Sequence, residues 1–243
     1  MNNILLLEDI KINHDAITDL QTLIRQPSVS AKNQGLVECA NLVSQIMRNA
    51  GIETKLLYLS NNNNNSIKRE GNNDDIPFPT AATPTLLPPI VYGEVISKSN
   101  PNGKTILFYN HYDVQPVEPV ELWNKNPFSG SVEGNYIFGR GAADDKGELI
   151  ARIKSVEYYL KKTNDVPCNV KFIVEGEEEI GSVHLKDYII LYKENFKCDG
   201  VIWESGFVDT IGRPIISLGQ KGILSVEIIS KGPYRDVHSS LLN

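Results

Sequence analysis

The sequence lacks the features of several protein classes. No stretch of its 243 residues approaches the roughly 20 consecutive apolar residues of a membrane-spanning helix, so no membrane association is expected. Residues 1–9 carry a four-residue apolar run without a basic flank, which makes a poor signal peptide. Lys and Arg (24) are fewer than Asp and Glu (30), and no basic stripe is present. The net charge of −6 therefore argues against a nucleic-acid partner.

Cysteine is also scarce. Cys39, Cys168 and Cys198 are an odd number and show no C-x-x-C spacing, so free thiols in a reducing compartment are expected rather than a disulfide framework. Hydrophobic residues (41%) and charged residues (22%) are in the proportions of an ordinary globular protein. The expected location is the cytoplasm.

Apolar periodicity predicts helices that alternate with strands. The expected helices cover residues 14–25, 36–50, 146–162 and 184–195, and the expected strands cover residues 55–59, 90–96, 105–109, 170–174 and 200–203. This alternation predicts an α/β fold with a largely parallel or mixed sheet flanked by helices. Near the end of the chain, residues 214–218 and 223–230 are expected to form two further strands and to begin a second domain.

One segment breaks the pattern. Residues 60–89 contain five consecutive asparagines and five prolines, and such a composition cannot bury enough apolar surface to order itself. We therefore expect an insert or a long loop here. The expected domains are residues 1–219, interrupted by this insert, and residues 220–243.

Residues that commonly ligate metals follow three of the apolar strands. Asn110-His111-Tyr112-Asp113 ends one strand, Glu175-Gly-Glu177-Glu178-Glu179 ends a second, and Glu204 ends a third, while Asp144-Asp145-Lys-Gly147 opens a helix. Ligands bind in the crevice outside the carboxyl ends of the strands of an open α/β sheet, so these groups are expected to converge. Carboxylates packed together repel one another, and bound cations would relieve that repulsion.

Each of these motifs alone has a simpler structural interpretation. A glutamate triplet is usually a solvated helix end, an H-x-D string is a common chance match, and D-D-K-G is often only a helix N-cap. The combination, with each motif at the end of a strand or the start of a helix, is what predicts a metal centre. A mixture of histidine and carboxylate ligands suits zinc, and manganese or cobalt are alternatives.

Three strings carry a resemblance to a known family. Residues 108–116 (FYNHYDVQP), 139–147 (GRGAADDKG) and 175–182 (EGEEEIGS) resemble the co-catalytic zinc metallopeptidases, a family of carnosinase-type dipeptidases, aminoacylases, glutamate-releasing carboxypeptidases and succinyl-diaminopimelate desuccinylase. The first string is most similar to the dipeptidase branch. The resemblance implies a zinc-exopeptidase-like catalytic domain, followed from about residue 220 by the first strands of a smaller α+β lid or dimerisation domain.

The resemblance also implies roles for individual residues. The first metal would be ligated by His111, Asp144 and Glu204, and the second by Asp144, which bridges both ions, together with Glu179. Asp113 would orient the imidazole of His111, and Asp145 would hold the turn across a strained peptide bond. Glu178 would be the general base, and Glu177 would be a bystander. In the lid segment, His238 would stabilise the oxyanion in the active site of a dimer partner, whereas His14 and His184 are expected to be structural or exposed.

Family members are about twice as long as this chain, and they supply one more histidine to the second metal. None of the four histidines here fills that role, so a fragment with an incomplete second site is expected. The favoured function is two-metal hydrolysis of dipeptides or N-acyl amino acids, with a homodimer expected for the full-length form. A non-catalytic remnant that binds one metal or a partner chain is the main alternative, and a purely structural α/β domain with an acidic surface is a third.

Overall fold

The structure is a computed structural model, and it describes residues 14–59, 87–204 and part of the segment 206–230 (residues 206, 209–217, 219, 222, 224 and 226–230). The chain divides into two units, residues 1–205 and 206–243, which are described separately. Among the described residues, no helix is long and apolar enough to cross a membrane. His238 and residues 60–86 lie outside the described residues.

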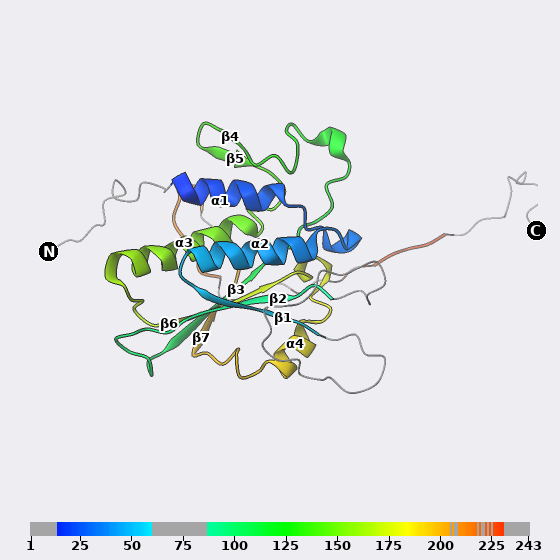
Figure 1. The fold of residues 1–243 in the computed structure, drawn as a ribbon. Helices are drawn as coiled ribbons and strands as arrows, with labels where there is room; N and C mark the ends of the chain where they lie inside the picture. Colours follow the sequence, from blue (N-terminus) through cyan, green and yellow to red (C-terminus); the bar gives the residue numbers. More distant parts are fainter. Residues whose placement is uncertain are drawn as a thin grey trace, which may run out of the picture. The chain divides into compact units, whose positions relative to one another are not determined.

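The first unit contains four α-helices and seven β-strands within its described residues (Figure 1). The helices are α1 (His14–Arg25), α2 (Leu36–Asn49), α3 (Lys146–Thr163) and α4 (Leu185–Leu191). The strands are β1 (Glu53–Leu57), β2 (Ile90–Val95), β3 (Thr105–His111), β4 (Ser131–Glu133), β5 (Tyr136–Phe138), β6 (Asn169–Glu175) and β7 (Gly200–Ile202). Short 3₁₀ helices occur at Ser30–Lys32, Val120–Leu122 and Glu178–Ile180.

Five strands form the central sheet in the order β1-β2-β6-β3-β7, and β4 pairs with β5 in a separate hairpin. The β3–β6 and β3–β7 pairs are parallel, whereas β1–β2 and β2–β6 are antiparallel. The sheet is therefore mixed. The parallel register places His111 opposite Glu175, so the carboxyl ends of β3 and β6 meet at one edge of the sheet.

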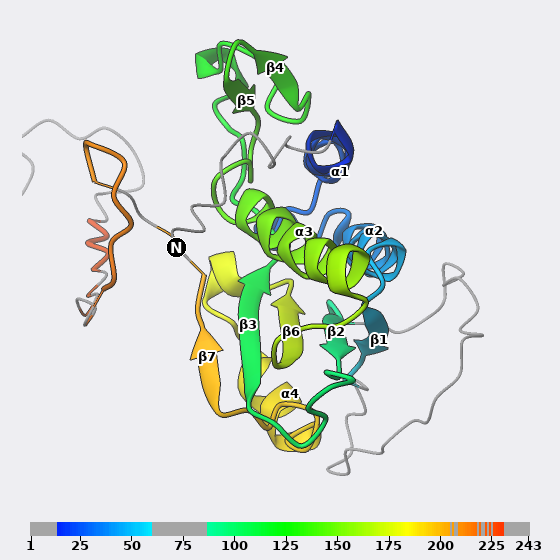
Figure 2. The same ribbon diagram turned by 90° about the vertical axis from the view of Figure 1, so that its left-hand side faces the viewer.

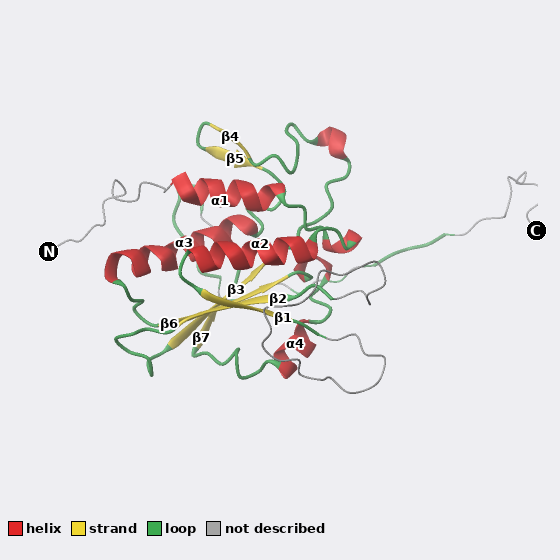
Figure 3. Cartoon of the chain, in the orientation of Figure 1, coloured by secondary structure: helices red, strands yellow, loops and turns green. Residues whose placement is uncertain are grey.

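Helices cover both faces of this sheet, as Figures 2 and 3 show: α1, α2 and α3 lie on one face and α4 on the other. The larger apolar core includes Val43 and Met47 of α2, Leu149 and Ile153 of α3, and Phe172 of β6. A smaller core lies beneath α4. Burying apolar side chains in this way contributes on the order of 1.5–3 kcal/mol each, and it holds the strand ends in fixed positions.

The described helices and strands confirm the α/β prediction, with differences in detail. The helix predicted over residues 184–195 ends at Leu191, and the strand predicted over residues 55–59 is observed at Glu53–Leu57. Pro88 and Pro89, which were assigned to the insert, are buried, and their carbonyl oxygens accept hydrogen bonds from the Tyr188 and Tyr112 hydroxyls. The hairpin of β4 and β5 was not predicted. The described residues of 214–218 and 223–230 belong to no assigned strand, because apolar alternation alone does not supply a partner strand.

In the second unit, the described residues include a turn around Asp209. Its carboxylate accepts hydrogen bonds from the backbone N–H groups of Ile211 and Arg213 and from the Arg213 guanidinium. The exposed apolar residues of this unit include Ile216, Leu224 and Ile228.

Candidate metal centre

His111 is the last residue of β3, and its side chain is fully buried. Its Nε2 atom lies 3.0 Å from Asp144 Oδ1, 3.4 Å from Glu204 Oε2 and 3.8 Å from Glu178 Oε2. Its Nδ1 atom lies 3.1 Å from the carbonyl oxygen of Asp113 and 3.3 Å from the carboxylate of the same residue. One imidazole therefore lies close to four carboxylates, those of Asp113, Asp144, Glu178 and Glu204.

Asp113 follows β3 and is completely buried. Its Oδ1 atom accepts a hydrogen bond from the backbone N–H of Glu178 at 3.2 Å, and its Oδ2 atom accepts one from the N–H of Glu179 at 3.1 Å. Asp113 thus contacts both the His111 ring and the backbone of the glutamate segment. This arrangement is suited to fixing the orientation of all three residues.

A glycine-rich turn presents Asp144 and Asp145. Gly141 has φ +84°, which favours glycine, and a Cβ atom at Gly147 would lie 2.1 Å from a backbone oxygen. The Asp144–Asp145 peptide bond is cis. The Asp144 side chain is 76% exposed, whereas Asp145 is buried and stands at the N-cap position of α3 without a side-chain hydrogen bond to the helix. The two aspartates therefore differ in environment although they are adjacent.

Lys146 connects this turn to the end of α1. Its side chain is fully buried, and its Nζ atom donates hydrogen bonds to the carbonyl oxygens of Leu23 (2.9 Å) and Gln26 (2.8 Å) at the end of α1. Burial lowers the pKa of the Lys146 ammonium. The contact fixes the first residue of α3 against α1.

The glutamate segment follows β6. Gln115 holds Glu179 with its backbone N–H (3.2 Å) and its side-chain amide (2.8 Å). Glu177 is buried, and its carboxylate oxygens lie 2.9 Å from His184 Nδ1. Glu177 belongs to neither group of candidate metal ligands, and its contact with His184 closes the loop that carries Glu178 and Glu179.

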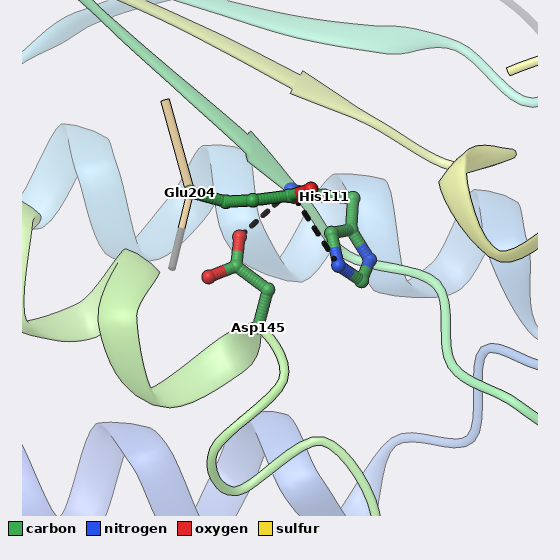
Figure 4. A group of neighbouring side chains, drawn as sticks. All are labelled: His111, Asp145 and Glu204. Atoms are coloured by element: carbon green, nitrogen blue, oxygen red, sulfur yellow. Dashed lines mark hydrogen bonds and ion pairs between the residues drawn. The ribbon is translucent and has the colours of Figure 1, made fainter. Parts of the chain in front are cut away.

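Two groups of side chains have the spacing to hold a metal ion within the described residues. One is His111, Asp145 and Glu204, shown in Figure 4, and the other is His111, Asp144 and Glu179. Asp145 Oδ1 and Glu204 Oε2 are two of the four buried side-chain atoms in the described residues that have no hydrogen-bond partner. Buried polar atoms without partners are costly, so these two oxygens fit the ligand set of a divalent cation.

Electrostatics support the same conclusion. Burial, reinforced by neighbouring carboxylates, raises the pKa of Glu204 to about 7, and burial also raises the pKa of Asp145 to about 6 and that of Glu179. Burial acts to lower the pKa of His111, but the hydrogen bond and charge of Asp113 and other carboxylates raise it to about 10. The raised pKa values of the carboxylates come mainly from burial and that of His111 from the surrounding negative charge, and a bound cation would favour the ionised carboxylates.

The structure brings together six of the seven site residues expected from the sequence. These residues are His111, Asp113, Asp144, Glu178, Glu179 and Glu204. It also places Asp145, which was expected only to hold the turn, in a ligand group with His111 and Glu204. Asp145 does hold the turn as well, because its Oδ2 atom accepts hydrogen bonds from Asn110 and from the N–H of His111. The seventh residue, His238, lies outside the described residues.

The family model for peptidase family M20/M25/M40 matches residues 107–233, which include every residue of both ligand groups. The chain belongs to this peptidase family. Its M20 relatives include the Cys-Gly metallodipeptidase dug1 of Schizosaccharomyces pombe, which is 37% identical over 158 residues covering 64% of this chain and 33% of the relative.

Two further M20 relatives show the same pattern. The Beta-Ala-His dipeptidase of Mus musculus is 32% identical over 155 residues, covering 63% of this chain and 31% of the relative. The M20 metallo-carboxypeptidase Sso-CP2 from Sulfolobus solfataricus superposes with a TM-score of 0.65 at 36% identity, covering 82% of this chain and 39% of that structure. The matched part of this chain thus covers about a third of the length of each of the two curated relatives. The mixed α/β architecture is that of an M20 catalytic domain.

Proposed function

We propose that this chain forms the metal-binding part of a hydrolase that cleaves the amide bond of dipeptides or N-acyl amino acids with two divalent metal ions. The observation that carries the proposal is the pair of ligand groups that share His111, with the Glu178 carboxylate 3.8 Å from the same imidazole. Membership of the M20 family and the metallodipeptidase names of the relatives support it.

The proposed ligands of the first ion are His111, Asp144 and Glu204, and those of the second are Asp144 and Glu179. Zinc suits this mixture of nitrogen and carboxylate donors, and manganese or cobalt would also be accepted. When bound, two such ions would supply Lewis acidity that acidifies a water molecule and polarises the scissile carbonyl. Asp145 Oδ1, which is buried beside His111 and Glu204, offers the first ion a further oxygen.

Glu178 is the proposed general base. Its side chain is one-third exposed, and its backbone N–H donates a hydrogen bond to Asp113. The backbone is therefore fixed close to the metal ligands, while the carboxylate is accessible to water. In the proposed reaction, the water oxygen bonds to the scissile carbonyl carbon while Glu178 takes the proton. The C–N bond then breaks, and Glu178 returns the proton to the leaving amine. Glu179 is less suited to this role because Gln115 holds its carboxylate.

Several parts of the proposal rest on the resemblance alone. His238 would stabilise the oxyanion in the active site of a dimer partner, and a further histidine from a longer parent chain would complete the second metal site. The homodimer, the cytoplasmic location and a division of the chain near residue 220 belong to the same proposal. The second candidate, metal binding without turnover, is favoured by the sharing of His111 between both ligand groups.

The test combines metal analysis with an assay. The chain is loaded with zinc, freed of loose metal and assayed on Cys-Gly, β-Ala-His and an N-acetyl amino acid. We expect Glu178→Gln to lower kcat by about 10²–10⁴-fold while the bound zinc stays the same. Glu121→Gln, which makes the same change at an exposed glutamate, is the control.

The outcomes separate the two candidate functions. Zinc-dependent turnover that fails in Glu178→Gln supports the hydrolase. Tightly bound zinc without turnover of any substrate by the wild-type chain selects metal binding alone as the function of these 243 residues by themselves. Wild-type turnover that survives in Glu178→Gln would show that another group is the base.

A further inference from the structure

Arg152 lies on the second turn of α3, and its side chain is only 14% exposed. Its Nη1 atom donates hydrogen bonds to the carbonyl oxygen of Tyr109 (2.7 Å) and to Asn110 Oδ1 (2.9 Å). Its Nη2 atom donates to the carbonyl oxygen of Trp203 (2.6 Å). A single guanidinium therefore joins α3 both to the carboxyl end of β3 and to the residue that follows β7.

On the β3 side, the Asn110 amide extends this connection to the metal centre. Because Arg152 donates to Oδ1 of the amide, the Nδ2 group of Asn110 faces Asp145, to whose Oδ2 atom it donates at 2.7 Å. The same Oδ2 atom accepts the backbone N–H of His111 at 3.0 Å. Arg152 thus sets the orientation of Asn110, which in turn holds Asp145 against His111.

On the β7 side, the connection reaches the residue that precedes Glu204. Glu204 follows Trp203, whose carbonyl oxygen accepts the Arg152 hydrogen bond and whose ring stacks on Tyr109 at 3.7 Å. Strand β7 has only three residues and pairs with β3 alone among the described strands. Since so few backbone contacts fix this segment, the hydrogen bond from Arg152 is a principal constraint on where Glu204 lies.

We propose that Arg152 is a positioning residue that sets the spacing of His111, Asp145 and Glu204 by tying the ends of β3 and β7 to α3. The inference rests on the proposed function only in assuming that this group binds a metal ion. Arginine suits the task because its planar fork directs several donors at once, whereas lysine offers a flexible point charge. The contacts of Arg152 span all three elements that carry the ligands.

The test compares Arg152→Lys with the wild-type chain and with Arg48→Lys. Arg48 is the matched control because it donates a hydrogen bond to Thr54 of β1, and β1 is at the opposite edge of the sheet from β7. Zinc affinity is measured by competition with a chelator, and the absorption spectrum of bound Co²⁺ reports the ligand geometry. We expect Arg152→Lys to weaken zinc binding by about 10- to 100-fold and to alter the Co²⁺ spectrum, while Arg48→Lys changes neither.

Hydrogen exchange of the metal-free chain gives a readout that does not depend on metal. Peptides covering residues 109–113 and 200–204 should exchange faster in Arg152→Lys, while the melting temperature falls no more than in Arg48→Lys. Unchanged zinc affinity and unchanged exchange in Arg152→Lys would overturn the proposal. If the wild-type chain binds neither ion, the proposed function fails, and the exchange comparison still decides whether Arg152 ties the strands.

A second variant covers the case in which Arg152→Lys does not fold. Asn110→Ser keeps the guanidinium but removes the amide that links it to Asp145. We expect a loss of zinc affinity similar to that of Arg152→Lys, and in a foldable double variant the two losses should be less than additive, because both residues act through one contact. A full zinc affinity in Asn110→Ser would contradict the proposed relay.

Discussion

The two ends of the parallel strands carry acidic residues in opposite environments. At the amino ends, Asp165 accepts hydrogen bonds from the backbone N–H groups of Lys98 (2.7 Å), Ser99 (2.9 Å) and Val166 (2.8 Å). Hydrogen bonds from Ser99, Lys98 and Val166 lower the pKa of Asp165. Asp199, which precedes β7, is likewise paired, and its pKa is also lowered.

At the carboxyl ends, by contrast, several carboxylates crowd around the single imidazole of His111. Asp145 and Glu204 each bury an oxygen atom that has no hydrogen-bond partner, and their pKa values are raised. The same residue type therefore stabilises the fold at one end of the sheet and is a cost to it at the other. Stability given up in this way is typical of binding sites, so the partners of a carboxylate indicate its role better than its position in a motif does.

The largest expected effect follows from removing a carboxylate at the carboxyl ends of the parallel strands. Glu204→Gln should weaken zinc binding by at least about 100-fold, since losing even an indirect partner of a metal costs 10- to 100-fold. The melting temperature of the metal-free chain should change little, because the amide relieves the repulsion from Glu178, Asp145 and Asp144 but also loses the ion pair with His111. Zinc at 100 times its Kd should stabilise the wild-type chain by about 2.7 kcal/mol and the variant hardly at all.

Calorimetric zinc titration and thermal unfolding with and without zinc check this prediction. Asp199→Asn is the matched control, since it changes an acidic residue at the opposite end of the strands. Tight zinc binding by Glu204→Gln would remove Glu204 from the ligand set.

An intermediate effect is expected at the contact between His184 and Glu177. His184→Ala leaves the buried Glu177 carboxylate without its imidazole partner, which should cost about 1–3 kcal/mol of unfolding free energy. Zinc affinity should fall by about 10-fold or less, because the loop that carries Glu178 and Glu179 loosens. His184→Asn retains a donor close to the position of Nδ1 and should restore most of both losses. Denaturant unfolding measures the loss of unfolding free energy, and zinc titration measures the loss of zinc affinity. If His184→Ala and His184→Asn gave the same values, the contact with Glu177 would contribute to neither.

The smallest effect on the metal centre is expected from Asp165→Asn. The amide has one acceptor oxygen where the carboxylate accepts several N–H groups, so the melting temperature at pH 7 should fall by a few degrees while zinc affinity is unchanged. The folded-state pKa of Asp165 is lowered, so its contribution is complete above the unfolded pKa of about 3.9 and is lost as the pH falls through the folded value. The difference from wild type should therefore shrink below about pH 4. Thermal unfolding at several pH values measures it, and a difference that persisted in acid would rule out the carboxylate charge as its cause.

Much of the fold could be predicted from the sequence. Regular apolar periodicity placed α1 and α3 to within a residue or two of their observed ends. The hairpin of β4 and β5 was missed because three-residue strands carry too short a pattern to detect. The burial of Pro88 and Pro89 was missed because it depends on tyrosines far away in the sequence.

The candidate site was predictable where it depended on strand ends. His111 and Glu204 converge because β3 and β7 are parallel neighbours, which the alternation of helices and strands already indicated. The contacts of Arg152 and the pairing of Glu177 with His184 were not predictable, since they depend on side-chain directions in three dimensions. Neither Arg152 nor His184 stands in a string that resembles a metal motif.

The antiparallel register of β1 and β2 has a consequence for how this sheet can vary. Leu57, the last residue of β1, pairs with Ile90, the first residue of β2, so the chain leaves the sheet and returns to it at neighbouring points. Because the strand pairing already holds these two ends together, the closure entropy of the chain that joins them grows slowly with the number of residues, by about 0.6 kcal/mol for each doubling. Relatives of this chain could therefore differ in the length of this connection at little cost to the sheet that carries the metal centre, as long as the buried residues Leu59, Pro88 and Pro89 are kept.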